Sequence, residues 1–186
     1  MNLIVGMTGA SGVVYGIRLL EIASGLADVE THLVVSRAAR QTIASESGKK
    51  YEEICALADF TYQPEDVGAQ IASGSFATSG MIVIPCSGKT LSAIALGLCG
   101  DLISRAAIVT LKEGRPLVLV VRETPLYLGH LRRMVEAAEA GAIIFPPVPA
   151  FYTMPRSLED IVDQTAGRVL ARAGFSNGAY QVWKGG

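Results

Sequence analysis

Short apolar runs recur along the chain, and most of them are followed by a segment with helical spacing. The first run, at residues 2–5, leads through a glycine-rich turn into a stretch where Val13, Ile17 and Leu20 recur as on one face of a helix. Later apolar runs predict strands at 29–35, 60–62, 81–85, 116–121 and 142–145, and the segments between and after them predict helices at 37–43, 51–58, 91–98, 101–112, 126–140 and 158–173. Because these strands are apolar throughout and alternate with helices, we predict an α/β fold of three layers, with a doubly wound parallel sheet covered on both faces.

The length and composition are those of a folded protein with a sizeable core. The 186 residues are 50% hydrophobic and 18% charged, which excludes a disordered chain. The mean hydropathy of +0.38 is high, and either a sheet buried on both faces or large subunit interfaces would explain it. We expect a single domain over residues 1–186, with a C-terminal tail from about residue 174.

Composition also disfavours several classes of partner and location. The formal net charge is −1 and there is no basic cluster, so we expect no nucleic-acid partner. Apolar runs fall short of the ~20 residues of a membrane span, and no basic region precedes the first run as it would in a signal peptide. The odd set Cys55, Cys86 and Cys99 lacks C-x-x-C spacing, and His32 and His130 are the only histidines. We therefore expect a cytoplasmic protein without a metal site.

The glycine-rich turn after the first strand is the first candidate binding site. Gly6, Gly9 and Gly12 precede a helix, and such a turn points backbone N–H groups and the positive end of the helix dipole at one spot. A phosphate is the natural ligand there, and Thr8 and Ser11 would add hydroxyl donors. The spacing is not that of the dinucleotide fingerprint, so the glycines could equally serve only a tight turn and close packing.

Polar residues also follow the later strands. Because ligands of parallel sheets bind beyond the carboxyl ends of the strands, we expect these residues to converge on one edge. They are Ser36 at a predicted helix N-cap, Ser87 to Thr90, Arg122 with Glu123, and Tyr152. The segment Gly88-Lys89-Thr90 is not a P-loop, since Val83 stands where that motif requires glycine; it is either a second anion-binding helix N-terminus or a simple N-cap. Cys86 lacks an evident partner base, which favours a buried structural thiol.

The charged candidates have two interpretations each. Arg122 and Glu123 form either a structural ion pair or an anion clamp with an adjacent acid–base group. Helical charges belong to solvated faces by default, and the candidates of this kind are Glu46, Arg105, Lys112 and Arg168. Trp183 either packs on its own domain or a neighbour, or covers a planar or cationic ligand.

Taken together, the motifs resemble those of the UbiX/Pad-type flavin prenyltransferases. The resemblance spans about residues 2–183 and rests on these segments: Met7–Gly12, Ser73–Phe76, Ile84–Thr90, Arg105–Ala107, Leu111–Glu113, Arg122–Leu126 and Pro147–Tyr152. It implies a flavodoxin-like Rossmann fold in a homododecamer. It also implies the reaction, in which dimethylallyl monophosphate alkylates reduced FMN at N5 and then C6, phosphate leaves without a metal, and the prenylated FMN passes to a UbiD-type decarboxylase.

The resemblance assigns roles by position. FMN binding falls to Gly9, Ala10, Ser11, Ser36, Ser87, Gly88, Lys89, Thr90 and Arg122. The residues that would bind the prenyl phosphate are Lys112, Glu123, Tyr152 and Arg168, with Tyr152 and Arg168 serving a site shared between subunits. Catalytic positions match Glu46, Glu123, Arg105, Lys112 and Trp183, the last as an aromatic wall near the prenyl group. Physical chemistry agrees, because a phosphate leaving group needs cations and an allylic cation needs electron-rich faces.

One position departs from the family pattern. Gly88 stands where the family commonly carries a bulkier apolar residue, so a side chain is missing from the flavin pocket. Three alternatives to the prenyltransferase stay open from the residues alone, and one of them is a direct decarboxylase. An FMN-binding redox protein would leave Lys112 and Arg168 without a role, and a non-catalytic flavin carrier or partner of an aromatic acid decarboxylase would not need Glu123.

Overall fold

A single six-stranded parallel sheet forms the middle layer. The computed structural model describes residues 1–183 and 185, and in it the strands lie in the order β3-β2-β1-β4-β5-β6. The strands are β1 (Asn2–Met7), β2 (Glu30–Val35), β3 (Phe60–Tyr62), β4 (Gly80–Cys86), β5 (Leu117–Val121) and β6 (Ile143–Ile144). The order reverses between β1 and β4, and a crevice forms at such a reversal, beyond the carboxyl ends of the two strands.

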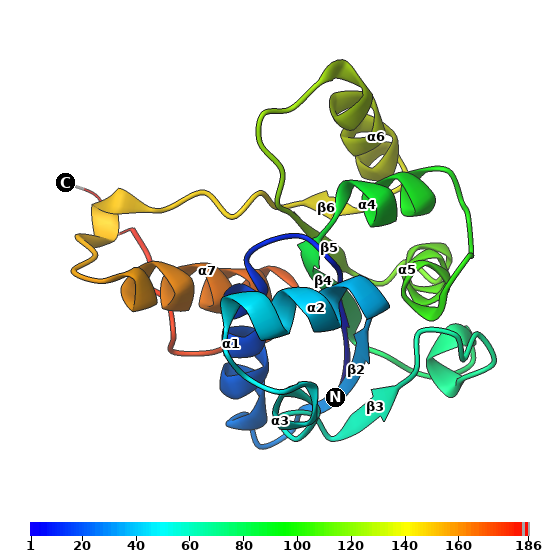
Figure 1. Ribbon diagram of the computed structural model, residues 1–186, viewed down its shortest axis with the longest axis horizontal. Helices are drawn as coiled ribbons and strands as arrows, with labels where there is room; N and C mark the ends of the chain where they lie inside the picture. The colour runs from blue at the N-terminus through cyan, green and yellow to red at the C-terminus, as the bar shows by residue number, and fades with distance from the viewer. Residues whose placement is uncertain (184, 186) are drawn as a thin grey trace.

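Helices cover both faces of the sheet (Figure 1). On one face lie α1 (Val13–Ser24), α2 (Arg37–Glu46), α3 (Tyr51–Cys55) and α7 (Leu158–Arg172). On the other lie α4 (Gly88–Ala95), α5 (Leu102–Lys112), α6 (Leu128–Glu139) and the short 3-10 helix η1 (Gln70–Ala72), while η2 (Phe151–Thr153) precedes α7. No helix among the described residues has both the length and the apolar character needed to cross a bilayer.

Two apolar cores result, one on each side of the sheet. Leu3, Val5 and Met7 of β1 point into the core beneath α1 and α7, whereas Ile4 points into the core beneath α4 and α5. A strand that buries successive residues on opposite faces must be apolar throughout. This confirms the predicted doubly wound α/β fold.

Most predicted elements are confirmed, and the differences lie at their ends. Helix α4 begins at Gly88 instead of near residue 91, because Ser87 is its N-cap and accepts a hydrogen bond from the Thr90 N–H. Helix α3 ends at Cys55, α6 begins at Leu128, and β6 has only two residues. The predicted caps Ser36 and Ser157 are confirmed, since their hydroxyls accept from the N–H groups three residues on.

Candidate active site

Thr8 joins the carboxyl ends of the two central strands. Its buried hydroxyl donates to the Pro85 carbonyl at 2.7 Å and accepts from the Ser87 N–H at 2.8 Å. The glycine-rich loop after β1 and the N-terminus of α4 are therefore held side by side at the crevice. The expectation that Thr8 donates its hydroxyl to a ligand is wrong, because its only O–H already donates to Pro85 within the chain.

Helix α2 packs directly against the glycine-rich loop. A Cβ at Gly9 would collide with the Ala38 side chain in the first turn of α2, so only glycine allows this approach. The hydroxyl of Ser36, at the N-cap of α2, accepts from the Ala39 N–H at 3.1 Å. The N-terminus of α2 consequently lies beside the loop that contains Gly9.

The N-terminus of α1 is already occupied by a carboxylate. Glu46, at the end of α2, accepts from the Gly12 N–H at 2.8 Å. Burial raises the pKa of Glu46, but hydrogen bonding from Ser11, Gly12 and Val13 outweighs it, and the pKa lies below its ordinary value. In the protein without a ligand, the Glu46 carboxylate therefore takes the position at this turn that the sequence predicted for a phosphate.

Arg122 and Glu123 extend from the end of β5 into the same region. The Arg122 side chain lies 3.8 Å from the point where a Cβ of Gly12 would stand, and its charge contributes to lowering the pKa of Glu46. Glu123 Oε2 lies 4.0 Å from the corresponding point at Gly88. We call this group the sheet-edge site, and its members are Gly9–Gly12, Ser36, Glu46, Ser87–Thr90, Arg122 and Glu123.

The other predicted site residues lie away from the sheet-edge site in the structure. Tyr152, Arg168 and Trp183 form a second group, the tail cluster, beside α7. Arg168 Nη1 lies 3.5 Å from the Tyr152 hydroxyl, and the Tyr152 and Trp183 rings meet edge to face at 5.5 Å between centroids. Sequence reasoning missed Gln164, whose side-chain amide bonds both the N–H and the carbonyl of Gln181 and so holds the tail against α7.

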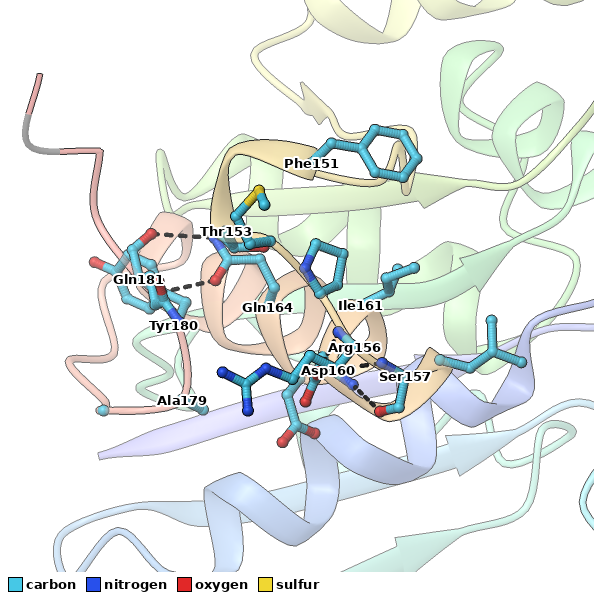
Figure 2. A pocket seen from close by; sticks show the side chains of 15 residues that line it. Phe151, Thr153, Arg156, Ser157, Asp160, Ile161, Gln164, Ala179, Tyr180 and Gln181 are labelled. Atoms are coloured by element: carbon cyan, nitrogen blue, oxygen red, sulfur yellow. Dashed lines mark hydrogen bonds between the residues drawn. The ribbon is translucent and has the colours of Figure 1, made fainter. Parts of the chain in front are cut away.

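A cavity of about 1310 Å³ lies next to the tail cluster. Figure 2 shows its walls, which come from η2, the first turns of α7 and the tail, with the Gln164–Gln181 hydrogen bonds at one side. In Figure 1 these elements project beyond the sheet, at the end of the long segment that follows β6. The cavity contains none of the residues of the sheet-edge site.

Arg105 and Lys112 form a third group on α5. Together with Ser73 and Gly74 they line a groove of about 460 Å³, which we call the α5 groove. Lys112 ends α5, just before β5, and therefore lies near the amino edge of the sheet. Arg122 follows the last residue of β5 at the opposite edge, and a strand of this length separates the two edges by roughly 16 Å. One chain alone does not bring Lys112 to the sheet-edge site.

Burial decides between the two interpretations of Cys86. The Cys86 side chain is fully buried, and burial raises the pKa of its thiol to about 12, which leaves no thiolate for nucleophilic attack. The interpretation of Cys86 as a structural thiol is thereby supported.

Within residues 1–183 and 185, no three side chains of His, Cys, Asp or Glu gather as metal ligands would.

Comparison with known proteins shows which family this fold and site belong to. The Flavoprotein family matches residues 1–170. The flavin prenyltransferase UbiX of Escherichia coli K12 is 58% identical over 169 residues, which cover 91% of this chain and 89% of that protein.

Two solved structures agree closely with the fold. AnUbiX (PadA1), in complex with FMN and dimethylallyl pyrophosphate, has a TM-score of 0.95 and 51% identity, covering 99% of this chain and 97% of that one. A dodecameric FMN-dependent UbiX-like decarboxylase from Escherichia coli O157:H7 has a TM-score of 0.96 and 48% identity over the full length of both chains.

Proposed function

The chain belongs to the UbiX family of flavin prenyltransferases, and from this we propose which substrates it takes and which residues act on them. It transfers a dimethylallyl group from dimethylallyl monophosphate to N5 and then C6 of reduced FMN. A C–N bond forms at N5 as the allylic C–O bond breaks and inorganic phosphate leaves. A C–C bond then forms at C6 as the remaining C=C bond takes up a proton, and the ring protons displaced from N5 and C6 are released. The prenylated FMN is released to a UbiD-type decarboxylase, and the protein works in the cytoplasm, which its three unpaired cysteines support.

The observation that carries the FMN assignment is the convergence of donors at the sheet-edge site. The N-termini of α2 and α4, which Ser36 and Ser87 cap, and the Arg122 side chain lie at the carboxyl edge of the sheet, around its topological reversal. Backbone N–H groups and a guanidinium are the donors that a phosphate monoester and the carbonyl edge of a flavin require. The residues present therefore fit FMN, with Gly9, Ala10, Ser11, Gly88, Lys89 and Thr90 as the remaining contacts.

Bound FMN supplies the nucleophilic ring nitrogen and carbon. The protein supplies charge, orientation and proton transfer. Lys112, Arg105 and Arg168 neutralise the phosphate as it leaves, with the Tyr152 hydroxyl as a further donor. Trp183 and Tyr152, whose rings meet edge to face, offer electron-rich surfaces to the allylic cation. Glu123, and Glu46 once released from Gly12, carry the proton away from the flavin ring.

These residues complete one site only when several copies assemble. The sheet-edge site of one chain receives Lys112 and Arg105 from a second copy and the tail cluster from another, in a homododecamer. Large apolar side chains exposed on α6 and before it support such interfaces, namely Leu126, Tyr127, Leu128, Leu131 and Val135. Figure 1 shows α6 at the top of the view, leaning away from the sheet.

One experiment tests the reaction. The purified protein is incubated without oxygen with reduced FMN and dimethylallyl monophosphate, and the mass of the extracted flavin is measured. We expect FMN enlarged by one C5H8 unit, with release of phosphate. Bound FMN of unchanged mass would leave a redox protein or a flavin carrier as the function.

Two variants test the assignment of residues. Glu123→Gln and Arg168→Ala should each lower the rate of product formation roughly 100-fold or more, because they remove a proton acceptor and a phosphate ligand. FMN affinity should stay within about twofold in both, since neither residue is assigned to the flavin phosphate. Loss of FMN binding in both variants would show that the two subsites are assigned wrongly.

A further inference from the structure

His130 faces the sheet-edge site although nothing in the sequence linked it to the chemistry. It lies in the first turn of α6, and α6 packs against α4, which begins at Gly88. Its Nε2 atom lies 3.2 Å from the point where a Cβ of Gly88 would stand. Since Gly88 has no side chain, the imidazole occupies the space that a side chain at this position would need.

Glu123 lies near the same point beside Gly88. Its Oε2 atom lies 4.0 Å from the point that is 3.2 Å from His130 Nε2. Its other oxygen, Oε1, accepts from the Thr124 N–H at 3.1 Å. Among the described residues Oε2 has no hydrogen-bond donor, so the free oxygen of Glu123 and the Nε2 atom of His130 border one gap beside Gly88.

The surroundings of His130 determine which nitrogen carries the proton. Nδ1 is buried and has no hydrogen-bond partner among the described residues, and the Tyr127 ring packs edge to face on the imidazole at 4.3 Å. A proton on Nδ1 would leave a buried N–H unpaired, and orphaned buried N–H groups are rarer in proteins than under-satisfied acceptors. The proton of a neutral imidazole therefore belongs on Nε2, the atom that borders the gap.

We propose that His130 is a positioning residue for Glu123: its Nε2–H donates to Glu123 Oε2 across Gly88 and holds the carboxylate in place for proton transfer. The pair is oriented from both ends, by the Thr124 N–H on Oε1 and by the imidazole on Oε2. This proposal rests on the proposed function, in which Glu123 accepts the proton from the flavin ring. His130 itself acts through Glu123 and not on the substrate.

Three substitutions separate positioning from a merely structural role. His130→Phe keeps a ring against Tyr127 but removes the donor. His130→Gln places an amide N–H where Nε2 stands, and His130→Asn places it nearer Nδ1. We expect kcat to fall roughly 10- to 100-fold in His130→Phe and His130→Asn and to recover most of the way in His130→Gln, because a hydrogen bond to a carboxylate is lost and restored. The KM for dimethylallyl monophosphate and the Kd for FMN should stay within about twofold.

A double-mutant cycle then shows whether the effect passes through Glu123. In the Glu123→Gln background, His130→Phe should lower kcat by less than about twofold, since the carboxylate it positions is gone. Equal rates for His130→Phe and His130→Gln, or additive losses in the double variant, would overturn the proposal.

A crystal structure of the wild-type protein with FMN gives a measurement that does not depend on turnover. The proposal requires Nε2 of His130 and Oε2 of Glu123 within about 3.2 Å of each other. A Glu123 side chain turned away from His130 would refute the pair even in an active enzyme. Conversely, a protein that makes no prenylated FMN would refute the proposed reaction. The distance between His130 Nε2 and Glu123 Oε2 would still show whether the two side chains are hydrogen-bonded.

Discussion

His32 is held neutral by its surroundings in β2. It is buried among Phe60, Tyr62 and Phe76, and its Nδ1 atom lies 2.9 Å from the Tyr62 hydroxyl. Burial lowers its pKa below the ordinary 6.5, and the charges of nearby carboxylates offset this only in part. As the pH falls, the unfolded chain therefore takes up a proton before the folded protein does.

The sign of the pH dependence follows from this difference. The contribution of His32 to stability is complete above pH 6.5 and is lost as the pH falls toward the lower pKa of the folded state. We expect the Tm to drop between pH 7.5 and pH 5.5. The drop should be smaller in His32→Phe, which cannot titrate. Identical drops in the two proteins would contradict the assignment to His32.

The three cysteines should differ in reactivity in the folded protein. Cys86 is buried and its pKa is raised to about 12, Cys55 is partly buried, and Cys99 is exposed. Because the thiolate is the reactive form, iodoacetamide at pH 8 should leave Cys86 unmodified in the native protein and modify it after unfolding in urea. Peptide mass mapping checks this. Native modification of Cys86 at the rate of Cys99 would contradict the burial.

At the scale of elements, the Thr8 hydroxyl joins β1 to the N-terminus of α4, and its contribution to the free energy of unfolding can be measured. Thr8→Val removes the hydroxyl while keeping the shape. It leaves the Ser87 N–H without a partner, whereas the Pro85 carbonyl still accepts from the backbone N–H of residue 8 at 3.2 Å. One donor left unpaired in this way costs about 1–3 kcal/mol in the free energy of unfolding. Urea denaturation measures that loss, and FMN affinity should fall with it because the two loops separate.

Thr8→Ser is the matched control for this prediction. It keeps the oxygen that bonds Pro85 and Ser87 and removes only a methyl group. It should therefore retain most of the stability and the FMN affinity lost in Thr8→Val. Equal destabilisation by both variants would mean that the methyl group, and not the hydroxyl, holds the two elements.

The elements themselves were largely predictable because their signals are local. Ser36 and Ser157 precede amphipathic segments, and both cap helices as predicted. Gly88 disfavours a helix interior, which is why the pattern placed the start of α4 too late, but in the first turn the Ser87 cap outweighs this preference.

The contacts of the site were less predictable because they join distant segments. Nothing near Thr8 in the sequence indicates that its hydroxyl bonds residues 77 and 79 positions away. The same holds for Glu46, which closes the N-terminus of α1 from the end of α2, and for His130, which borders Gly88 from another helix. The sequence did predict that residues following the strands gather at the carboxyl edge of the sheet, since that follows from strand order and fold class.

At the scale of the whole molecule, the direction of α5 separates residues that we propose act in one active site. Lys112 lies at the amino edge of the sheet, Arg122 and Glu123 lie at the carboxyl edge, and the tail cluster lies beyond the sheet. Such separation has a physical solution in a symmetric oligomer, where a surface of one copy completes the site of another. A site divided in this way makes a quantitative prediction about mixed oligomers.

Lys112→Ala and Glu123→Gln should each be inactive alone but regain activity when co-expressed. If Lys112 and Glu123 of one site come from different copies, random mixing in equal amounts gives roughly a quarter of the sites both native residues. Product formation by the mixture should therefore reach about a quarter of the wild-type rate per site. Co-expression of Glu123→Gln with Arg122→Ala is the matched control, because these neighbours belong to the same chain in every site and no mixture restores both. Activity in the control, or none in the first mixture, would contradict a site shared between copies.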